Sequence, residues 1–190
     1  MENVLLQVNT RAQFRQWLLE NARQADECWL SLKRGEPVGS DTFYYLDAVE
    51  EALCFGWIDS TLTNVEGIAL QRFTPRRAGS HWTELNKQRV RRLEKLGLMT
   101  DAGRRVLPPM GPRSFRADPE IVAALKRARV WKRFQAFPPL YQRIRLSNIQ
   151  FYKQRNMDYN AALERLIEST KKGKMYGVWD DYGRLTDSDY

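Results

Sequence analysis

The stretch Trp57-Ile-Asp-Ser-Thr-Leu-Thr63 is followed by Asn64-Val-Glu-Gly67 and then by Ile68-Ala-Leu-Gln-Arg-Phe-Thr74. The two outer runs are rich in β-branched and aromatic residues, which favour strands. The middle run begins with asparagine and ends with glycine, which are residues typical of tight turns. The pattern therefore predicts two strands joined as a β-hairpin, and this hairpin is the centre of the expected fold.

The residues before the hairpin predict two helices and a further strand. Thr10 can cap a helix over residues 11–22, and residues 27–34 alternate between apolar and polar side chains as a half-buried strand does. Residues 44–55 have helical spacing and end at Gly56, whose missing Cβ permits the left-handed turn that closes a helix. We therefore expect an α+β fold with a small antiparallel sheet and helices.

The residues after the hairpin predict mainly helices. Ser80 is the expected cap of a helix over residues 81–96, and residues 107–119 hold four prolines, which cannot continue a helix. Helical spacing returns in three later segments, which we expect to pack on the sheet part as a C-terminal three-helix segment: residues 120–136, 140–155 and 159–172.

This reading divides the chain into four parts. An α+β domain is expected over residues 1–106, a proline-rich connection over 107–119, a helical segment over 120–174 and an acidic aromatic tail over 175–190. The tail contains four aromatic residues besides its acidic ones, a composition too apolar for a fully solvated segment. We expect at least residues 175–185 to dock on the rest of the protein.

Charge is distributed unevenly along the chain. Residues 71–174 carry 25 lysines and arginines against eight aspartates and glutamates, whereas residues 1–70 carry five against 11. A basic segment of this kind attracts polyanions, so nucleic acid or a phosphorylated small molecule is the expected partner. Within it Lys87, Arg91 and Lys95 recur every four residues and form a candidate polyanion surface. The alternative is that basic side chains merely keep helix faces soluble.

The residue inventory argues against several classes of protein. One histidine and two cysteines are too few for the common zinc sites, and neither a Gly-x-Ser-x-Gly motif nor a phosphate-binding glycine loop occurs. We therefore expect no metal and no cofactor, and we favour a binding protein over an enzyme. No apolar run reaches the roughly 18 residues of a membrane span, and residues 1–3 lack the start of a signal peptide, so we expect a cytoplasmic location. The oligomeric state is left open.

Two longer segments carry a resemblance to a known family. They read Ala48-Val-Glu-Glu-Ala-Leu-Cys-Phe-Gly-Trp-Ile-Asp59 and Gln71-Arg-Phe-Thr-Pro-Arg-Arg-Ala-Gly-Ser-His-Trp-Thr-Glu-Leu-Asn86. This pattern resembles the bacterial YdeI/OmpD-associated family, also described as bacteriocin-protection proteins, over about residues 10–105. The helical half departs from that family at Ile149-Gln-Phe-Tyr-Lys153. The resemblance implies an α+β domain followed by helices, with no established activity.

The second of these segments has the composition of a ligand site. Three arginines, Arg72, Arg76 and Arg77, precede the expected helix at Ser80, whose first N–H groups would favour a phosphate or a carboxylate. Further candidates are Trp57 and Trp82 as stacking faces and Asp59 and Asn86 as orienting groups. The alternative is that the tryptophans are core residues and that Asp59 pairs with one of the arginines.

A cluster of acidic residues lies in the helix before the hairpin. Asp47 and Glu51 are four residues apart and can converge on one helix face, whereas the adjacent Glu50 and Glu51 cannot. We expect an exposed acidic face here rather than a pair of catalytic carboxylates.

Overall fold

The computed structural model describes residues 5–39 and 42–186, which form two compact units. The first unit comprises the described residues up to Ser80 together with residues 89–108, and the second comprises residues 81–88 and 109–186. The change at Pro108 falls inside the predicted proline-rich connection. Residues 81–88, however, belong to the second unit, so the predicted domain over residues 1–106 is not one continuous stretch.

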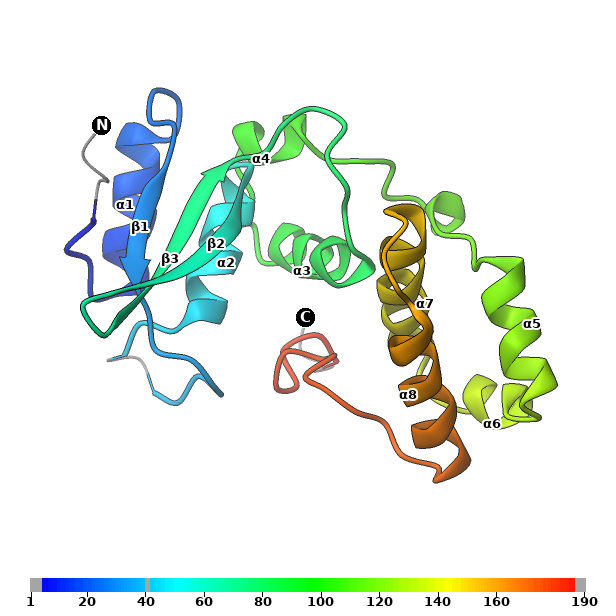
Figure 1. Cartoon of the computed structure of the whole chain (residues 1–190). Coiled ribbons are helices and arrows are strands. Elements are labelled where there is room, and N and C mark those ends of the chain that lie inside the picture. The colour runs from blue at the N-terminus through cyan, green and yellow to red at the C-terminus, as the bar shows by residue number, and fades with distance from the viewer. Residues whose placement is uncertain (1–4, 40–41, 187–190) are drawn as a thin grey trace. The chain divides into compact units, whose positions relative to one another are not determined.

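The first unit has an α+β architecture, as the hairpin and its flanking helices predicted (Figure 1). Thr10 caps the first helix: its Oγ1 accepts a hydrogen bond from the backbone N–H of Gln13 (3.2 Å), and its own N–H donates to Oε1 of the Gln13 side chain. The elements are α1 (Arg11–Asn21), β1 (Cys28–Ser31), α2 (Tyr45–Cys54), β2 (Trp57–Val65), β3 (Ile68–Pro75), the second part of α3 (Glu84–Lys95) and α4 (Asp101–Arg105).

The three strands form an antiparallel sheet in the order β1-β3-β2. The β2–β3 pair is the predicted hairpin, with Val65 opposite Ile68 at its turn. Cys28 lies opposite Phe73 in the register, and both residues are fully buried. Because successive side chains of a strand point to opposite faces, these pairs define one buried face of the sheet.

Helices α1 and α2 cover this buried face (Figure 1). The ring of Phe14 on α1 lies 5.7 Å from that of Phe73 on β3, and the ring of Trp17 meets that of Trp57 edge-on at 5.8 Å. All of these residues except Trp17 are almost completely removed from solvent. Burial of large aromatic side chains thus joins the helices to the sheet.

The sequence did not predict α4, which depends on a close contact between two backbones. A Cβ added to Gly103 would lie only 2.3 Å from the carbonyl oxygen of Cys54. Only glycine therefore permits this approach. Thr100, which caps α4 through the N–H of Gly103, also donates its hydroxyl hydrogen to the same carbonyl (2.6 Å).

The predicted cap of the α3 helix is wrong. The helix begins at Glu84 rather than at residue 81, and Thr83 Oγ1 accepts the hydrogen bond from the backbone N–H of Asn86 (3.1 Å). A second N–H of this first turn, that of Glu84, donates to Ser147 Oγ (3.3 Å). Both Ser80 and Thr83 are residues that can cap a helix, so the sequence does not choose between them. The hydrogen bond from Glu84 to Ser147 joins residues 63 positions apart, and spacing along the sequence cannot show it.

The described part of the second unit is helical apart from its C-terminal segment. Its core is formed by side chains from all of its longer helices, including Ile121, Phe134, Ile144 and Leu166, each at most 1% exposed. The elements are the first residues of α3, a 3-10 turn over Pro112–Ser114, α5 (Pro119–Arg127), α6 (Trp131–Gln135), α7 (Pro139–Gln154) and α8 (Asn160–Lys171).

The predicted helix over residues 120–136 is wrong, because it is divided into α5 and α6. The C-terminal segment therefore has four α-helices among the described residues instead of three. The break lies at Arg129, which has a positive φ of 58°, and it allows Val130 and Phe134 to enter the core. No glycine or proline marks this position, so the usual sequence signals of a helix end are missing. The packing of these helices on the sheet stays a prediction.

The predicted tail is partly buried. Trp179 belongs to the core of the second unit, where its ring meets that of Tyr141 edge-on at 5.6 Å, and Leu185 is 8% exposed. Residues 187–190 of this tail lie outside the described residues. Within the described ranges, none of the helices combines the length and the apolar character that crossing a membrane requires.

Candidate functional site

The structure separates the residues of the predicted ligand site. Asp59 lies opposite Phe73 in the sheet register and shares the face covered by the helices, whereas Arg72 lies opposite Trp29 on the other face. Arg72 donates to Glu27 through Nε (2.7 Å) and Nη2, and its guanidinium lies 6.0 Å from the centre of the Trp29 ring. Arg72 and Asp59 therefore cannot converge on one ligand.

The prediction that Trp57 offers a stacking face is wrong. Its side chain is 1% exposed, packs against Trp17 and donates its indole N–H to the carbonyl oxygen of Ala22 (3.2 Å). Trp82 is also buried, and it belongs to the second unit. The interpretation of these two tryptophans as core residues is the one that their burial supports.

A smaller polar cluster remains around Asp59 in the first unit. Asp59 accepts a hydrogen bond from the hydroxyl of Tyr45 (2.6 Å), and the guanidinium of Arg34 lies 4.2 Å from the centre of the Tyr45 ring. Burial and the Asp59 carboxylate raise the pKa of Tyr45, so its hydroxyl stays protonated and remains the donor. Burial lowers the pKa of Arg76 to about 10, an effect that Asp59 partly offsets. Tyr45 and Arg34 were not predicted.

The expected anion site at a helix start is not formed at Ser80. Arg76 Nη1 lies 3.4 Å from Ser80 Oγ, and Arg77 is exposed. Helix α3 begins instead at Glu84. The N–H of Glu84 donates to Ser147 and that of Asn86 donates to Thr83, so these two N–H groups are already occupied. The helix start therefore does not supply the donors that the prediction required.

The predicted polyanion surface on α3 is also wrong in part. Lys87 is 7% exposed, and its Nζ pairs with Glu84 Oε1 at 3.0 Å. Arg91 is half-buried, and Lys95 alone of the three predicted residues is exposed. The spacing of four residues places these three side chains on one face of the helix. Only the C-terminal end of that face is exposed to solvent.

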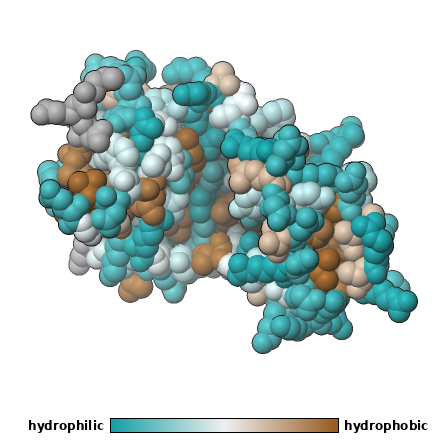
Figure 2. All heavy atoms as spheres, viewed as in Figure 1, coloured by the Kyte–Doolittle hydropathy of each residue, from teal (hydrophilic) through white to brown (hydrophobic). Residues whose placement is uncertain are grey.

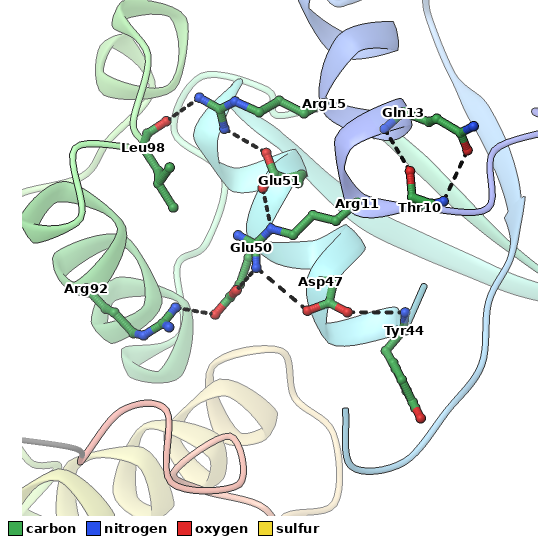
Figure 3. A network of polar contacts seen from close by, with 10 residues as sticks. All are labelled: Thr10, Arg11, Gln13, Arg15, Tyr44, Asp47, Glu50, Glu51, Arg92 and Leu98. Carbon is green, nitrogen blue, oxygen red and sulfur yellow. Dashed lines mark hydrogen bonds and ion pairs between the residues drawn. The ribbon is translucent and has the colours of Figure 1, made fainter. Parts of the chain in front are cut away.

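The acidic residues of α2 form a buried network instead of the expected exposed face (Figure 3). Glu50 is fully buried and binds Nη1 of Arg11 (2.8 Å) and Nη1 of Arg92 (2.9 Å). Glu51, which is 2% exposed, binds Nε of Arg11 (2.5 Å) and Nη1 of Arg15 (2.7 Å). The expectation of an exposed face was wrong because helical spacing does not show which neighbours cover it.

This network connects three helices of the first unit. Arg15 also donates to the carbonyl oxygen of Leu98 (2.9 Å), and Asp47 accepts from the N–H of Tyr44 (3.3 Å) (Figure 3). Burial by itself lowers the pKa of Arg11, but Glu50 and Glu51 outweigh it, so the pKa of Arg11 is raised. The oxygens of these buried carboxylates already bind arginines, so they are not available for acid–base chemistry.

A group of eight exposed cations lies at one end of the helices of the second unit. We call it the basic end; it comprises Lys126, Arg127, Arg129, Lys132, Arg133, Lys171, Lys172 and Lys174, all of them exposed. Figure 1 shows the turn from α5 to α6 and the last turn of α8 at the same end of this unit, and Figure 2 colours this part of the surface as hydrophilic.

Direct contacts hold the two halves of the basic end together. Arg133 Nη1 donates a hydrogen bond to the carbonyl oxygen of Lys171 at the end of α8. The ammonium of Lys126 lies 6.0 Å from the centre of the Trp131 ring, and Lys171 pairs with Glu168 at 2.7 Å. The ion pair with Glu168 thus involves one of the eight cations, which leaves a strong positive excess at this end.

The sequence contained a signal for the basic end that the prediction did not use. The run Lys126-Arg-Ala-Arg-Val-Trp-Lys-Arg133 holds five basic residues. It was treated as part of one continuous helix, and the break at Arg129 changes the direction of its side chains. The second half of the group, at the end of α8, could be joined to it only by the tertiary fold.

The comparison with family models identifies the first part of the chain. A model described as a domain of unknown function, DUF8412, matches residues 6–106. The chain belongs to this family. The DUF8412 match ends where the predicted α+β domain ends, and it leaves the basic end outside. No curated protein and no solved structure gives a significant match. The relation to the YdeI/OmpD-associated family stays a prediction.

No candidate metal centre is found in the ranges that the structure covers, in which His, Cys, Asp and Glu side chains do not gather in groups of three suited to a metal ion. Both cysteines are buried, and burial with a neighbouring carboxylate raises the pKa of Cys28 and of Cys54 to about 12. A thiol with such a pKa is protonated at neutral pH and is a poor nucleophile.

Proposed function

We propose that this chain is a polyanion-binding protein, with nucleic acid as the first candidate ligand, and that the basic end is its binding surface. The observation that carries the proposal is the group of eight exposed cations on two segments that a hydrogen bond joins. Phosphate groups neutralise exposed lysines and arginines and release condensed counterions, which is the main source of affinity for nucleic acid.

The charge distribution between the units supports this choice of surface. Residues 81–88 and 109–186 carry 17 lysines and arginines against eight aspartates and glutamates, whereas residues 1–80 and 89–108 carry 14 against 13. The positive field thus originates in the second unit. This distribution favours the basic end over Arg91 and Lys95, which lie in the nearly neutral unit, and the third residue of the predicted surface, Lys87, is buried.

Contacts between basic side chains and phosphate groups carry no direct sequence information. The contacts of the basic end would therefore be with the nucleic-acid backbone, and sequence preference would be weak. We further propose a cytoplasmic location, which the sequence favoured. We keep the expectation of a binding protein rather than an enzyme as part of this proposal.

Fluorescence anisotropy with a labelled single-stranded oligonucleotide tests the proposal. Affinity should fall steeply with added salt, with a slope of log K against log salt of roughly −0.7 for each phosphate neutralised. The double variant Lys132→Glu and Lys172→Glu should bind at least about ten-fold more weakly, because each lost contact removes counterion release and each added charge repels phosphate.

The matched control is Lys95→Glu, because Lys95 is also exposed but belongs to the other predicted surface. This control should bind as the unmodified chain does. An affinity that does not respond to salt would contradict the proposal. Weakening by Lys95→Glu alone, with no effect of the double variant, would return the binding surface to α3.

A further inference from the structure

A separate cavity of about 320 Å³ lies in the second unit between α7, α8 and the segment that follows α8. This volume is at the lower end of the roughly 300–1,000 Å³ typical of small-molecule sites. None of its lining residues belongs to the basic end. The polar residues of the wall are Arg145, Asn148, Tyr152, Arg165 and Tyr176, and the apolar ones are Ile149, Ala161 and Ala162.

Two positive charges meet at one aromatic ring in this cavity. The guanidinium carbon of Arg145 lies 4.3 Å from the centre of the Tyr176 ring, and that of Arg165 lies 4.5 Å from it. Among the residues that the structure describes, neither arginine forms an ion pair with a carboxylate. Cation–π contacts hold these arginines in place but do not neutralise them, so an anion in the cavity that both residues line would be strongly attracted.

Arg145 is fixed in position before any ligand arrives. Its Nη2 donates to the carbonyl oxygen of Tyr176, and its guanidinium also lies 5.2 Å from the centre of the Tyr141 ring. Gly177, with φ of 69°, permits this approach, since a Cβ there would lie 2.8 Å from Nη2. Arg145 Nε is buried and has no hydrogen-bond partner in the described structure. A buried donor of this kind is costly unless a ligand satisfies it.

The remaining wall suits a flat apolar group. Ile149 is buried beneath the cavity, while Ala161 and Ala162 are small side chains at the start of α8. Tyr152 is 37% exposed and offers a ring that a planar group can stack on. Burial raises the pKa of Tyr176, an effect that Arg145 and Arg165 partly offset, so its hydroxyl is neutral and can also donate to a ligand.

We propose that this cavity binds a small phosphate ester that carries a flat ring. The phosphate is held by the guanidinium groups of Arg145 and Arg165, which provide charge-assisted hydrogen bonds, and the ring lies against Tyr152 and the alanines. The site is distinct from the basic end and does not depend on nucleic-acid binding. Its ligand is a discrete molecule that fills a cavity, whereas a polyanion chain needs an extended surface.

Isothermal titration calorimetry of the whole chain tests this site with phenyl phosphate as the probe. The unmodified protein should bind phenyl phosphate more tightly than inorganic phosphate at the same ionic strength. The variant Arg165→Gln should weaken binding by about ten-fold or more, because it removes one charge-assisted contact from an exposed side chain that the fold does not require.

The matched control is Arg155→Gln. Arg155 is also an exposed arginine over an aromatic ring, 4.4 Å from the centre of Phe151, but it does not line the cavity. Arg155→Gln should leave the affinity for phenyl phosphate unchanged. The double variant Lys132→Glu and Lys172→Glu should also leave it unchanged. A second variant, Gly177→Ala, should weaken binding by displacing Arg145.

Three results would overturn the proposal. The first is no binding of phenyl phosphate to the unmodified chain. The second is equal weakening by Arg165→Gln and Arg155→Gln, which would show a general effect of charge. The third is equal affinity for inorganic phosphate and phenyl phosphate, which would rule out the ring-binding wall. Loss of oligonucleotide binding in the charge-reversed basic end, with phenyl phosphate binding retained, would separate the two sites.

Discussion

In the first unit Arg11 and Arg92 bind the buried carboxylate of Glu50, whereas in the second unit Arg145 and Arg165 lie over the ring of Tyr176 with no carboxylate partner among the described residues. The first unit is nearly neutral and the second is strongly basic. Arginine therefore does different work in the two units. In the first, Arg11 and Arg92 join helices, and in the second, Arg145 and Arg165 keep an uncompensated charge at a cavity.

This comparison explains why the charge of the chain is a poor guide by itself. Residues 89–108 lie in the basic part of the sequence but belong to the nearly neutral first unit. There Arg92 pairs with Glu50, an acidic residue 42 positions earlier in the chain. A charge whose partner lies close to it in the fold is neutralised locally, and only the remainder creates a long-range field. The four predictions below follow in order of expected effect.

The largest effect is expected for Glu50→Gln in the buried network. This change leaves the guanidinium groups of Arg11 and Arg92 beside a neutral amide, and loss of one partner of a buried ion pair costs about 3 kcal/mol or more. Cys28 and Cys54 are buried with a pKa of about 12 and both lie in the first unit, so thiol labelling reports the opening of that unit. Their labelling rate should rise about 100-fold.

The control for this variant is Glu168→Gln in the exposed pair with Lys171. It should leave the labelling rate of both cysteines unchanged. An equal rate for Glu50→Gln and the unmodified chain would show that the network contributes no net stability, and the contrast between the units would then rest on the second unit alone.

A smaller effect is expected for Asp118→Ala, which removes the cap of α5. Asp118 Oδ1 accepts from the N–H of Glu120 (2.8 Å) and of Ile121 (3.4 Å), while Oδ2 pairs with Nζ of Lys153 (2.7 Å). Loss of such a cap costs about 1 kcal/mol. Thermal unfolding of the variant and of the unmodified chain at neutral pH measures this difference.

The same cap gives a pH dependence. Burial by itself raises the pKa of Asp118, but the bonds from Lys153 and the two backbone N–H groups outweigh it and lower the pKa. A carboxyl whose pKa is lower in the folded state stabilises fully above its unfolded pKa, about 3.9, and loses this contribution as pH falls through the folded value. The variant should therefore differ less from the unmodified chain in strong acid. A constant difference would contradict this.

The smallest effect is expected from salt. Raising ionic strength from about 0.01 M to about 0.1 M shortens the Debye length from roughly 30 Å to roughly 10 Å. Repulsion among the exposed cations of the basic end should weaken, which stabilises the second unit by about 0.5 kcal/mol on the scale of exposed charge interactions. Hydrogen exchange of amides in α7 should slow while exchange in α2 stays the same. Equal responses in both helices would remove the contrast.

The parts of the fold that the sequence predicted are those with strong local signals. The hairpin, α1 with its Thr10 cap, α2 and α7 appear close to the predicted residues, because side-chain periodicity and turn residues act within a few positions. The start of α3 and the break at Arg129 were missed. In each case the local sequence permitted two structures. The contact with Ser147 accompanies the start of α3 at Glu84, and the burial of Phe134 accompanies the break at Arg129.

The candidate sites were predicted less well than the fold. The sequence indicated a basic segment that would bind anions. It placed the polyanion surface at Lys87, which is buried. It placed the ligand site at Trp57, which lies in the core, and at Arg72, which lies on the opposite face of the sheet. Arg145, Arg165 and Tyr176 were not selected, because they are separated by up to 31 positions and no motif links them.

The sequence by itself determined the α+β class, the hairpin, the helical second half and the excess of positive charge, since these depend on composition and on spacing within one element. Only the tertiary structure decided which charges are neutralised. Glu50 meets Arg92 and Arg145 meets Tyr176 because packing brings distant segments together, and the energy of a charge depends on its nearest partners and on burial. That information is absent from any local pattern.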